Sequence, residues 1–315
     1  METTNPAPAA TYVGLDVAKD RLDYAVDGTR CDHVANTVSG HARLLAVLRP
    51  LQGVRVICEA TGGYERAIVA TLLLAKCEVC VVNPGRVRAF AHAEGLLAKT
   101  DRIDAQLLRR FGQKVQPRLH APMDQTAIIL RELIDYRRQV SDQLVAVRNR
   151  LELAGKVLRT RLDAQLVFLQ NELTETDRLI QEHLDQDDTL RRKAERLREL
   201  KGAGPVLTAT LLAYVPELGD IASPQLSALI GVAPFARDSG RSQRARHVRG
   251  GRGAVRHVLY MAAVAASRHN PVLRDFYTRP IAAGKPKPVA LVAVMRKMLH
   301  VLNRLIADPN FVLVR

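Results

Sequence analysis

The feature that most constrains the fold is a stretch of 77 residues, Asp124 to Leu200, with no proline and a single glycine, Gly155. Proline and glycine are the residues that most disfavour helix interiors, so their near absence favours long helices. Apolar residues recur here at three- and four-residue steps: Leu133, Tyr136, Val140, Leu144, Val147, Leu151, Leu158, Leu162, Leu166, Leu169, Leu173, Ile180 and Leu184. This pattern predicts long antiparallel helices or a coiled coil. Such an arm serves as a scaffold or for dimerisation, and its basic faces could also contact RNA or DNA.

The residues before this stretch predict a mixed sheet. Alternating apolar residues predict a hairpin of strands at 12–17 and 21–26. Three more strands are predicted at 33–35, 54–58 and 78–82. Helices are expected at 39–48, with Ser39 as the N-cap, at 64–76 and at 101–112. The order β-β-β-α-β-α-β-α is typical of a sheet with helices on its faces.

Four carboxylates lie at strand positions or at a helix start in this first part: Asp16, Glu59, Asp101 and Asp104. Asp101 and Asp104 are three residues apart, so on a helix they share a face and repel each other. A divalent cation relieves that repulsion, whereas capping of the helix by Asp101 is the alternative for this pair alone. All four together predict a site for Mg²⁺ or Mn²⁺ that faces phosphate. Three other aspartates are assigned to the exposed face or the turn of the hairpin: Asp20, Asp23 and Asp27.

The charge of the chain indicates a polyanionic partner. The net charge is +15 and the isoelectric point is about 10.1, which favours nucleic acid or an acidic membrane surface. Residues 201–315 carry 17 Lys and Arg against five Asp and Glu. The chain has no Trp and only 4% aromatic residues, which argues against a single-strand binder that stacks bases. No signal peptide and no apolar run of membrane-spanning length are recognised, so a soluble, cytosolic protein is expected.

A basic loop carries much of this charge. Seven arginines lie within residues 237–256 and are expected to bind phosphate: Arg237, Arg241, Arg244, Arg246, Arg249, Arg252 and Arg256. Glycines among them let the backbone approach a ligand closely, and a helix is expected near Ala254. Ser239 and Ser242 lie in the same loop. Taken alone, a serine beside glycine is most often a turn residue, and the residues themselves leave open which serine, if either, is reactive.

A second phosphate-binding element is predicted at residues 200–205, Leu-Lys-Gly-Ala-Gly-Pro, ahead of an apolar helix. This pattern is typical of a helix-hairpin-helix, in which free backbone N–H groups of a glycine-rich turn hold a phosphate. Lys201, Gly202 and Gly204 are the candidate contacts. A hairpin with a purely structural role is the alternative.

The cysteines favour structural thiols. Cys77 and Cys80 have the spacing of half a zinc site, but no second pair exists and they fall in a strand-like run. Residues i and i+3 of a strand point to opposite faces. The other two cysteines are Cys31 and Cys58. We therefore expect all four to be buried and reduced.

Several segments together resemble the DEDD transposases of the insertion-sequence 110 family. The matching segments are Val13–Lys19, Cys58–Tyr64, Val82–Phe90, Ala98–Ala105, Leu229–Pro234, Asp238–Gly240, the Arg/Gly run and Arg256–Tyr260. The resemblance implies a multidomain α/β plus α chain with three domains. These are a RuvC-like (ribonuclease H-like) DEDD domain at 1–122, coiled-coil helices at 123–200 and a mainly helical C-terminal transposase domain at 201–315.

The resemblance also implies a mechanism. Asp16, Glu59, Asp101 and Asp104 fall on the DEDD tetrad, and Ser239 falls on the catalytic serine. Members are DNA recombinases that form a 5′-phosphoserine link, act as homo-oligomers up to tetramers, and use a bridge RNA that pairs with donor and target DNA. A prokaryotic, nucleoid-associated protein is implied. Two other functions fit the residues: a metal-dependent junction-resolving nuclease that uses water, and a non-catalytic nucleic-acid-binding assembly factor.

Overall fold

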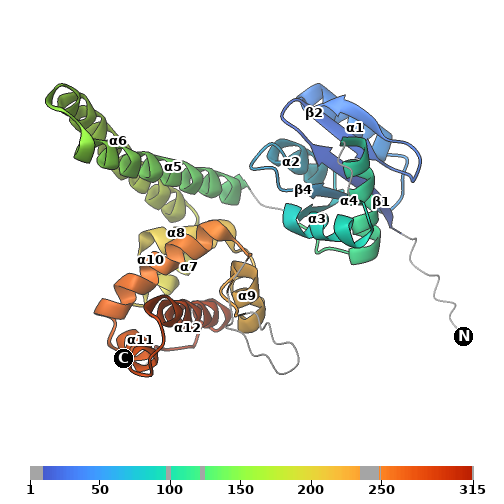
Figure 1. Cartoon of the computed structure of the whole chain (residues 1–315). Helices are drawn as coiled ribbons and strands as arrows, with labels where there is room; N and C mark the ends of the chain where they lie inside the picture. The colour runs from blue at the N-terminus through green and yellow to red at the C-terminus, as the bar shows by residue number, and fades with distance from the viewer. Residues whose placement is uncertain (1–9, 97–100, 121–124, 235–247, 249, 314–315) are drawn as a thin grey trace, which may run out of the picture. The chain divides into compact units, whose positions relative to one another are not determined.

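The protein is described here by a computed structural model that covers residues 10–96, 101–120, 125–234, 248 and 250–313, with the side chains of 101–103 left out. The chain forms two compact units, Met1–Pro122 and Met123–Arg315 (Figure 1). The first unit is a mixed α/β structure and the second is helical. None of the helices in the described ranges has the length and apolar character needed to cross a membrane.

A five-stranded sheet organises the first unit. Its strands are β1 (Thr11–Val17), β2 (Arg21–Ala25), β3 (Asp32–Ala35), β4 (Val54–Glu59) and β5 (Glu78–Val82). Their order across the sheet is β3-β2-β1-β4-β5. β1 pairs antiparallel with β2 and parallel with β4, so the sheet is mixed. The predicted order of strands and helices is confirmed, with two helices, α3 and α4, after the last strand.

Helices cover both faces of this sheet. The helices are α1 (Val38–Leu48), α2 (Arg66–Leu74), α3 (Pro84–Ala93) and α4 (Asp101–Val115). Leu44 of α1 and Leu72 of α2 pack on Leu15 and Val56 at one face. On the other face, α4 packs on Ile57 and Cys80, with Leu108 and Phe111 in that core. Alternate residues of β1 and β4 therefore face different helices, as the strand period requires.

Two glycines let α4 approach the sheet closely. A Cβ at Gly14 of β1 would lie 1.9 Å from the carbonyl oxygen of Ala105, and a Cβ at Gly112 of α4 would lie 2.5 Å from Ile57. α4 thus runs antiparallel to β1. The C-terminal half of α4 lies over the beginning of β1, and the N-terminus of α4 lies over the end of β1. The start of α4 lies at the carboxyl ends of β1 and β4.

The second unit begins with a long helical hairpin, α5 (Gln125–Leu153) and α6 (Lys156–Gln186), drawn in green in Figure 1. Val140, Leu144 and Val147 of α5 pack on Leu169 of α6. The prediction of long antiparallel helices is confirmed. α7 (Asp188–Arg198) follows, and the Asp187 carboxylate caps it by accepting from the backbone N–H groups of its first turn, at 2.8 and 2.9 Å.

The remaining helices share the main hydrophobic core of this unit. They are α8 (Pro205–Tyr214), α9 (Ser223–Ile230), α10 (Gly253–His269), α11 (Pro271–Ala282) and α12 (Lys287–Ala307). Met298, Leu299 and Leu302 of α12 are fully buried in the main core of this unit. Buried Asn303 of α12 accepts from the N–H of Gly219 at 2.8 Å and donates to the carbonyl of Ile221 at 2.9 Å. The α8–α9 connection is therefore fixed to the core.

One local prediction is wrong. The N-cap of α1 is Thr37, not Ser39, because the Thr37 hydroxyl accepts from the N–H of Gly40 and the helix begins at Val38. The side chain of an N-cap residue usually accepts from the backbone N–H two or three residues later, as Thr37 does from Gly40. Ser39 lies inside the first turn of the helix.

Candidate active site and nucleic-acid interface

Three of the four predicted acids lie at one end of the sheet. Asp16 and Glu59 belong to neighbouring parallel strands, whose register pairs Leu15 with Cys58, one residue earlier in each. Gly14 contacts α4 and Ile57 lies in the core beneath α4, so Asp16 and Glu59, two residues further, share that face.

The third acid comes from the helix. Asp104 immediately precedes Ala105, the residue in backbone contact with Gly14. The N-terminus of α4 thereby reaches the strand ends that carry Asp16 and Glu59. Asp101 starts the same helix one turn earlier, but its side chain lies outside the described residues.

Asp23 is a buried carboxylate that the sequence assigned to the exposed side of the hairpin; this assignment is wrong. Asp23 pairs directly with Asp16 across the β1–β2 ladder, so both side chains are on the α4 face. It is only 6% exposed, and the guanidinium of Arg21 donates to both of its oxygens at 2.8 and 2.6 Å. The missed signal is the alternation of Arg21, Asp23 and Ala25 against the apolar Leu22 and Tyr24.

The donor set at this end of the sheet is made of carboxylate oxygens, which are the ligands that Mg²⁺ and Mn²⁺ prefer. Asp16, Glu59 and Asp104 each interact with neighbours. Within the described part of the chain, no three acidic, histidine or cysteine side chains stand close enough together to hold an ion as they are. The residue types and the strand-end placement fit a divalent cation.

None of the four cysteines forms a disulfide in the structure. Cys58 and Cys80 are buried, while Cys31 and Cys77 are partly exposed, so the expectation of burial is correct for two of the four. Cys77 packs against the core under α1 and α2, and Cys80 belongs to the core under α4. These opposite faces agree with the argument against a zinc pair. Burial raises the pKa of Cys80 to about 11, so its thiol stays protonated.

The predicted helix-hairpin-helix turn lies between α7 and α8. Lys201 is exposed, and its carbonyl accepts from the side-chain amide of Asn270 at 2.9 Å. Gly202 has φ +114°, and a Cβ there would lie 2.6 Å from the Cβ of Ala266 in α10. Packing thus accounts for Gly202, whereas Gly204 is exposed and open space surrounds it at the start of α8.

Two of the seven loop arginines are described, and both make protein contacts. Arg252 donates to the two carboxylate oxygens of Glu217 at 2.6 and 2.7 Å. Arg256 donates to the carbonyl of Gly250. The other predicted residues of this loop lie outside the described residues: Arg237, Ser239, Arg241, Ser242, Arg244, Arg246 and Arg249.

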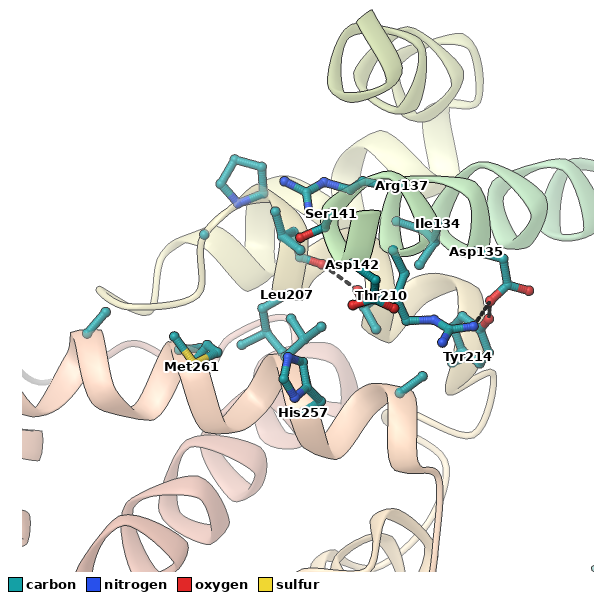
Figure 2. Close-up of a pocket in the computed structure, with 18 of the residues that line it drawn as sticks. Ile134, Asp135, Arg137, Ser141, Asp142, Leu207, Thr210, Tyr214, His257 and Met261 are labelled. Carbon is teal, nitrogen blue, oxygen red and sulfur yellow. Dashed lines mark hydrogen bonds and ion pairs between the residues drawn. The ribbon is translucent and has the colours of Figure 1, made fainter. Parts of the chain in front are cut away.

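A cavity of about 410 Å³ lies between α5, the start of α8 and α10, and sequence patterns gave no sign of it (Figure 2). Gly202 and Gly204 line it near α8, and His257 and Met261 of α10 line it from the other side. At one end Tyr214 of α8 donates a hydrogen bond to the buried Asp135 of α5. The cavity connects the glycine turn with the first half of α10.

Comparisons with known proteins identify the class. A family model described as a transposase, of the DEDD type found in IS110, matches residues 13–154. A second model, described as a transposase of the IS116/IS110/IS902 family, matches residues 194–278. The chain is thus a transposase, an enzyme class that cleaves and recombines DNA. It belongs to the IS110/IS116 family.

Relatives of known name agree with this assignment. The chain is 28% identical over 303 residues to pilin gene-inverting proteins of Moraxella lacunata and Moraxella bovis, covering 92% of this chain and 94% of each relative. It is 31% identical over 162 residues to an uncharacterized 42 kDa protein of insertion element IS900 from Mycobacterium paratuberculosis, covering 50% of this chain and 39% of that protein. The similarity to the first two extends over nearly the whole chain.

Proposed function

We propose that this transposase excises and inserts a mobile DNA element by a serine-dependent recombination reaction at a divalent-metal site. The observation that carries the proposal is the gathering of Asp16, Glu59 and Asp104 at one end of the sheet, in a chain of the IS110/IS116 family. The strand order β3-β2-β1-β4-β5 supports a RuvC-like, ribonuclease H-like domain at 1–122. The helical arm at 123–200 and the C-terminal domain at 201–315 complete the three functional parts.

The acidic residues are proposed to hold Mg²⁺ or Mn²⁺ through Asp16, Glu59, Asp101 and Asp104. When bound, such an ion supplies Lewis-acid activation and neutralises charge on the phosphate that is attacked. Arg21 neutralises Asp23 on the same face, so the buried aspartate does not add an uncompensated charge beside Asp16.

Ser239 is proposed as the nucleophile. Its hydroxyl oxygen attacks a DNA phosphodiester and loses its proton, a phosphoserine ester forms at the 5′ end, and the leaving 3′ oxygen takes up a proton. Because one ester replaces another, the reverse attack by a 3′-hydroxyl reseals DNA without ATP. Basic side chains and the backbone of the glycine turn are proposed to hold the phosphates before and during this exchange. The basic side chains are Arg237, Arg241, Arg244, Arg246, Arg249 and Lys201, and the turn contributes Gly204.

Choice of the DNA site is proposed to rest on a bridge RNA that pairs with donor and target DNA, with the protein acting as a homo-oligomer. Delegation of sequence recognition to base pairing suits a protein whose contacts are mainly to phosphate. The names of the Moraxella relatives refer to inversion of a gene. Inversion and excision need the same cleavage and rejoining steps and differ in the orientation of the two sites.

A covalent intermediate tests the proposal. The protein is purified from cells that also transcribe the DNA flanking its gene, and is mixed with Mg²⁺ and a plasmid carrying the gene with both flanks. We expect a protein–DNA adduct on denaturing gels that is lost in Ser239→Ala and kept in Ser242→Ala. Cleavage at full rate by Ser239→Ala would instead identify a water-using nuclease. Biological activity that survives Asp16→Ala and Asp104→Ala would identify an assembly factor.

A further inference from the structure

The two ends of the segment that carries Ser239 are joined at their base by a built structure, which we call the loop stem: residues 229–232 and 250–252. Gly231 is the left-handed cap of α9, with φ +81°, and Gly251 has φ +73°. A Cβ at Gly251 would lie 2.3 Å from the N of Gly231, and one at Gly231 would lie 2.1 Å from the carbonyl oxygen of Gly250. The two backbone segments therefore cross in contact that only glycine permits.

Hydrogen bonds hold the crossing together. The N–H of Arg252 donates to the carbonyl of Leu229 at 3.1 Å. The buried Ser227 accepts through its carbonyl from Gly231, Val232 and Ala233, at 3.1, 2.9 and 3.1 Å. The chain that leaves α9 is thereby fixed up to the residue before Pro234.

Side chains lock the returning segment. The guanidinium of Arg252 makes a bidentate ion pair with Glu217. The side chain of Arg252 is 29% exposed and that of Glu217 is 12% exposed. Glu217 belongs to the α8–α9 connection, which Asn303 ties to the core helix α12. A second arginine, Arg256, donates to the carbonyl of Gly250. Such partly buried, bidentate pairs are stronger and more directional than ion pairs on the open surface.

We infer that Glu217 and Arg252 are positioning residues for the Ser239 segment, with Arg256 as their support, and that Arg252 does not hold DNA phosphate. The inference rests on the proposed function of Ser239. Five peptide units span at most about 17 Å, so the position of Pro234 limits where the serine can act. Because both terminal nitrogens of the Arg252 guanidinium already donate to Glu217, a contact between Arg252 and phosphate would require breaking a partly buried ion pair.

The test compares Glu217→Ala and Arg252→Ala with Glu182→Ala. Glu182 is a matched control, because it also pairs with an arginine, Arg178, but on the exposed surface of α6. Adduct formation is measured with saturating plasmid below the melting temperature of each variant, together with DNA affinity at several salt concentrations. The double variant Glu217→Arg/Arg252→Glu restores an ion pair of reversed polarity.

We expect Glu217→Ala and Arg252→Ala to form the adduct about 100-fold more slowly, since small misplacement of a reacting group has effects of that size. Their DNA affinity and its salt slope should match those of wild type, and the backbone amide of residue 252 should exchange hydrogen faster than in wild type. The double variant should recover most of the rate, and the control should keep all of it. A rescued rate separates positioning from general loss of structure.

Two results would overturn the inference alone. One is a wild-type rate in folded Glu217→Ala. The other is a salt slope lowered by about one in Arg252→Ala, which is the signature of a lost phosphate contact. If wild type itself forms no adduct that depends on Ser239, the proposed function fails, and the inference fails with it.

Discussion

Gly14 of β1 and Ala105 of α4 are in backbone contact, and a Cβ on Gly14 would come within 1.9 Å of the Ala105 carbonyl oxygen. This contact brings the N-terminus of α4 to the strand ends that carry Asp16 and Glu59. The position of Asp104 therefore depends on the absence of a side chain two residues before Asp16.

The variant Gly14→Ala is expected to push α4 away from the sheet. The neighbour is backbone and cannot rotate aside, so we expect a loss of about 3 kcal/mol or more in the free energy of unfolding, and loss of adduct formation. Gly28→Ala is the control, because its nearest neighbour is the mobile end of the Arg109 side chain at 3.3 Å. Urea unfolding of both variants measures the difference. Equal stability of the two would contradict the close packing of α4.

The faces of the sheet could be predicted from the sequence, because alternation in β1 and β4 places Asp16 and Glu59 on one side and Leu15 and Cys58 on the other. The order of strands and helices along the chain also followed from the pattern of apolar and turn residues. What the pattern could not supply is which residues face each other across a hairpin. Asp23 was misplaced for this reason, since its burial comes from the register with Asp16 and from α4, which lies about 80 residues further along the chain.

In the helical unit, the long helices were predictable from their lack of proline and glycine, but their partners were not. The Glu217–Arg252 pair joins residues 35 positions apart. Arg252 looks like any other arginine of a basic run until its partner is seen. Gly202 likewise fits a phosphate-binding turn in the sequence, whereas packing on Ala266 explains it in the structure.

Neutralising one acid of the proposed site is expected to abolish chemistry and to leave the fold intact. Asp104→Asn and Asp16→Asn should each lower adduct formation at least about 100-fold, the usual cost of losing a group that stabilises charge in the transition state. Thermal stability should be unchanged or slightly raised, because each substitution removes one negative charge and so lowers the repulsion among the carboxylates. Asp20→Asn, in the exposed β1–β2 turn, is the charge-matched control. A mutant that loses activity only by unfolding would not support a catalytic role.

Removal of divalent metal should have the same selective effect. With EDTA in excess, we expect no adduct, restored by Mg²⁺ or Mn²⁺ and not by Ca²⁺ at equal concentration, because Ca²⁺ accepts a looser and larger ligand shell. Isothermal titration with Mn²⁺ should detect binding in wild type and a weaker signal in Asp104→Asn. Full adduct formation in EDTA would rule out the metal site.

Stability at high pH should depend on Tyr214. Burial first, and then its hydrogen bond to Asp135, raises the pKa of Tyr214 to about 12, against about 10 in the unfolded chain. A raised pKa means that the folded state favours the protonated form of Tyr214. The resulting contribution to the free energy of unfolding is complete below pH 10 and is lost between about pH 10 and 12. Unfolding measured against pH should therefore show a steeper decline for wild type than for Tyr214→Phe.

At neutral pH, Tyr214→Phe should destabilise the α5–α8 contact by about 1–3 kcal/mol, because Asp135 is only 8% exposed and loses the hydrogen bond from Tyr214. Tyr136→Phe is the control, since the hydrogen bond from the Tyr136 hydroxyl to Glu172 is exposed to solvent, and this variant should change stability by less than about 0.5 kcal/mol. Equal losses of stability in the two variants would show that the buried hydrogen bond contributes no more than the exposed one.

The glycines of the α7–α8 turn are expected to separate packing from DNA binding. Gly202→Ala places a Cβ 2.6 Å from Ala266 at φ +114°, so it should cost about 2–3 kcal/mol of stability. Gly204→Ala meets no atom within 4 Å and should keep or slightly raise stability, yet weaken DNA binding if the backbone of this turn approaches a phosphate. Melting temperature and DNA affinity, measured for both variants in the same buffer, decide the matter. A stable Gly204→Ala protein that binds DNA as wild type does would leave the turn with a structural role only.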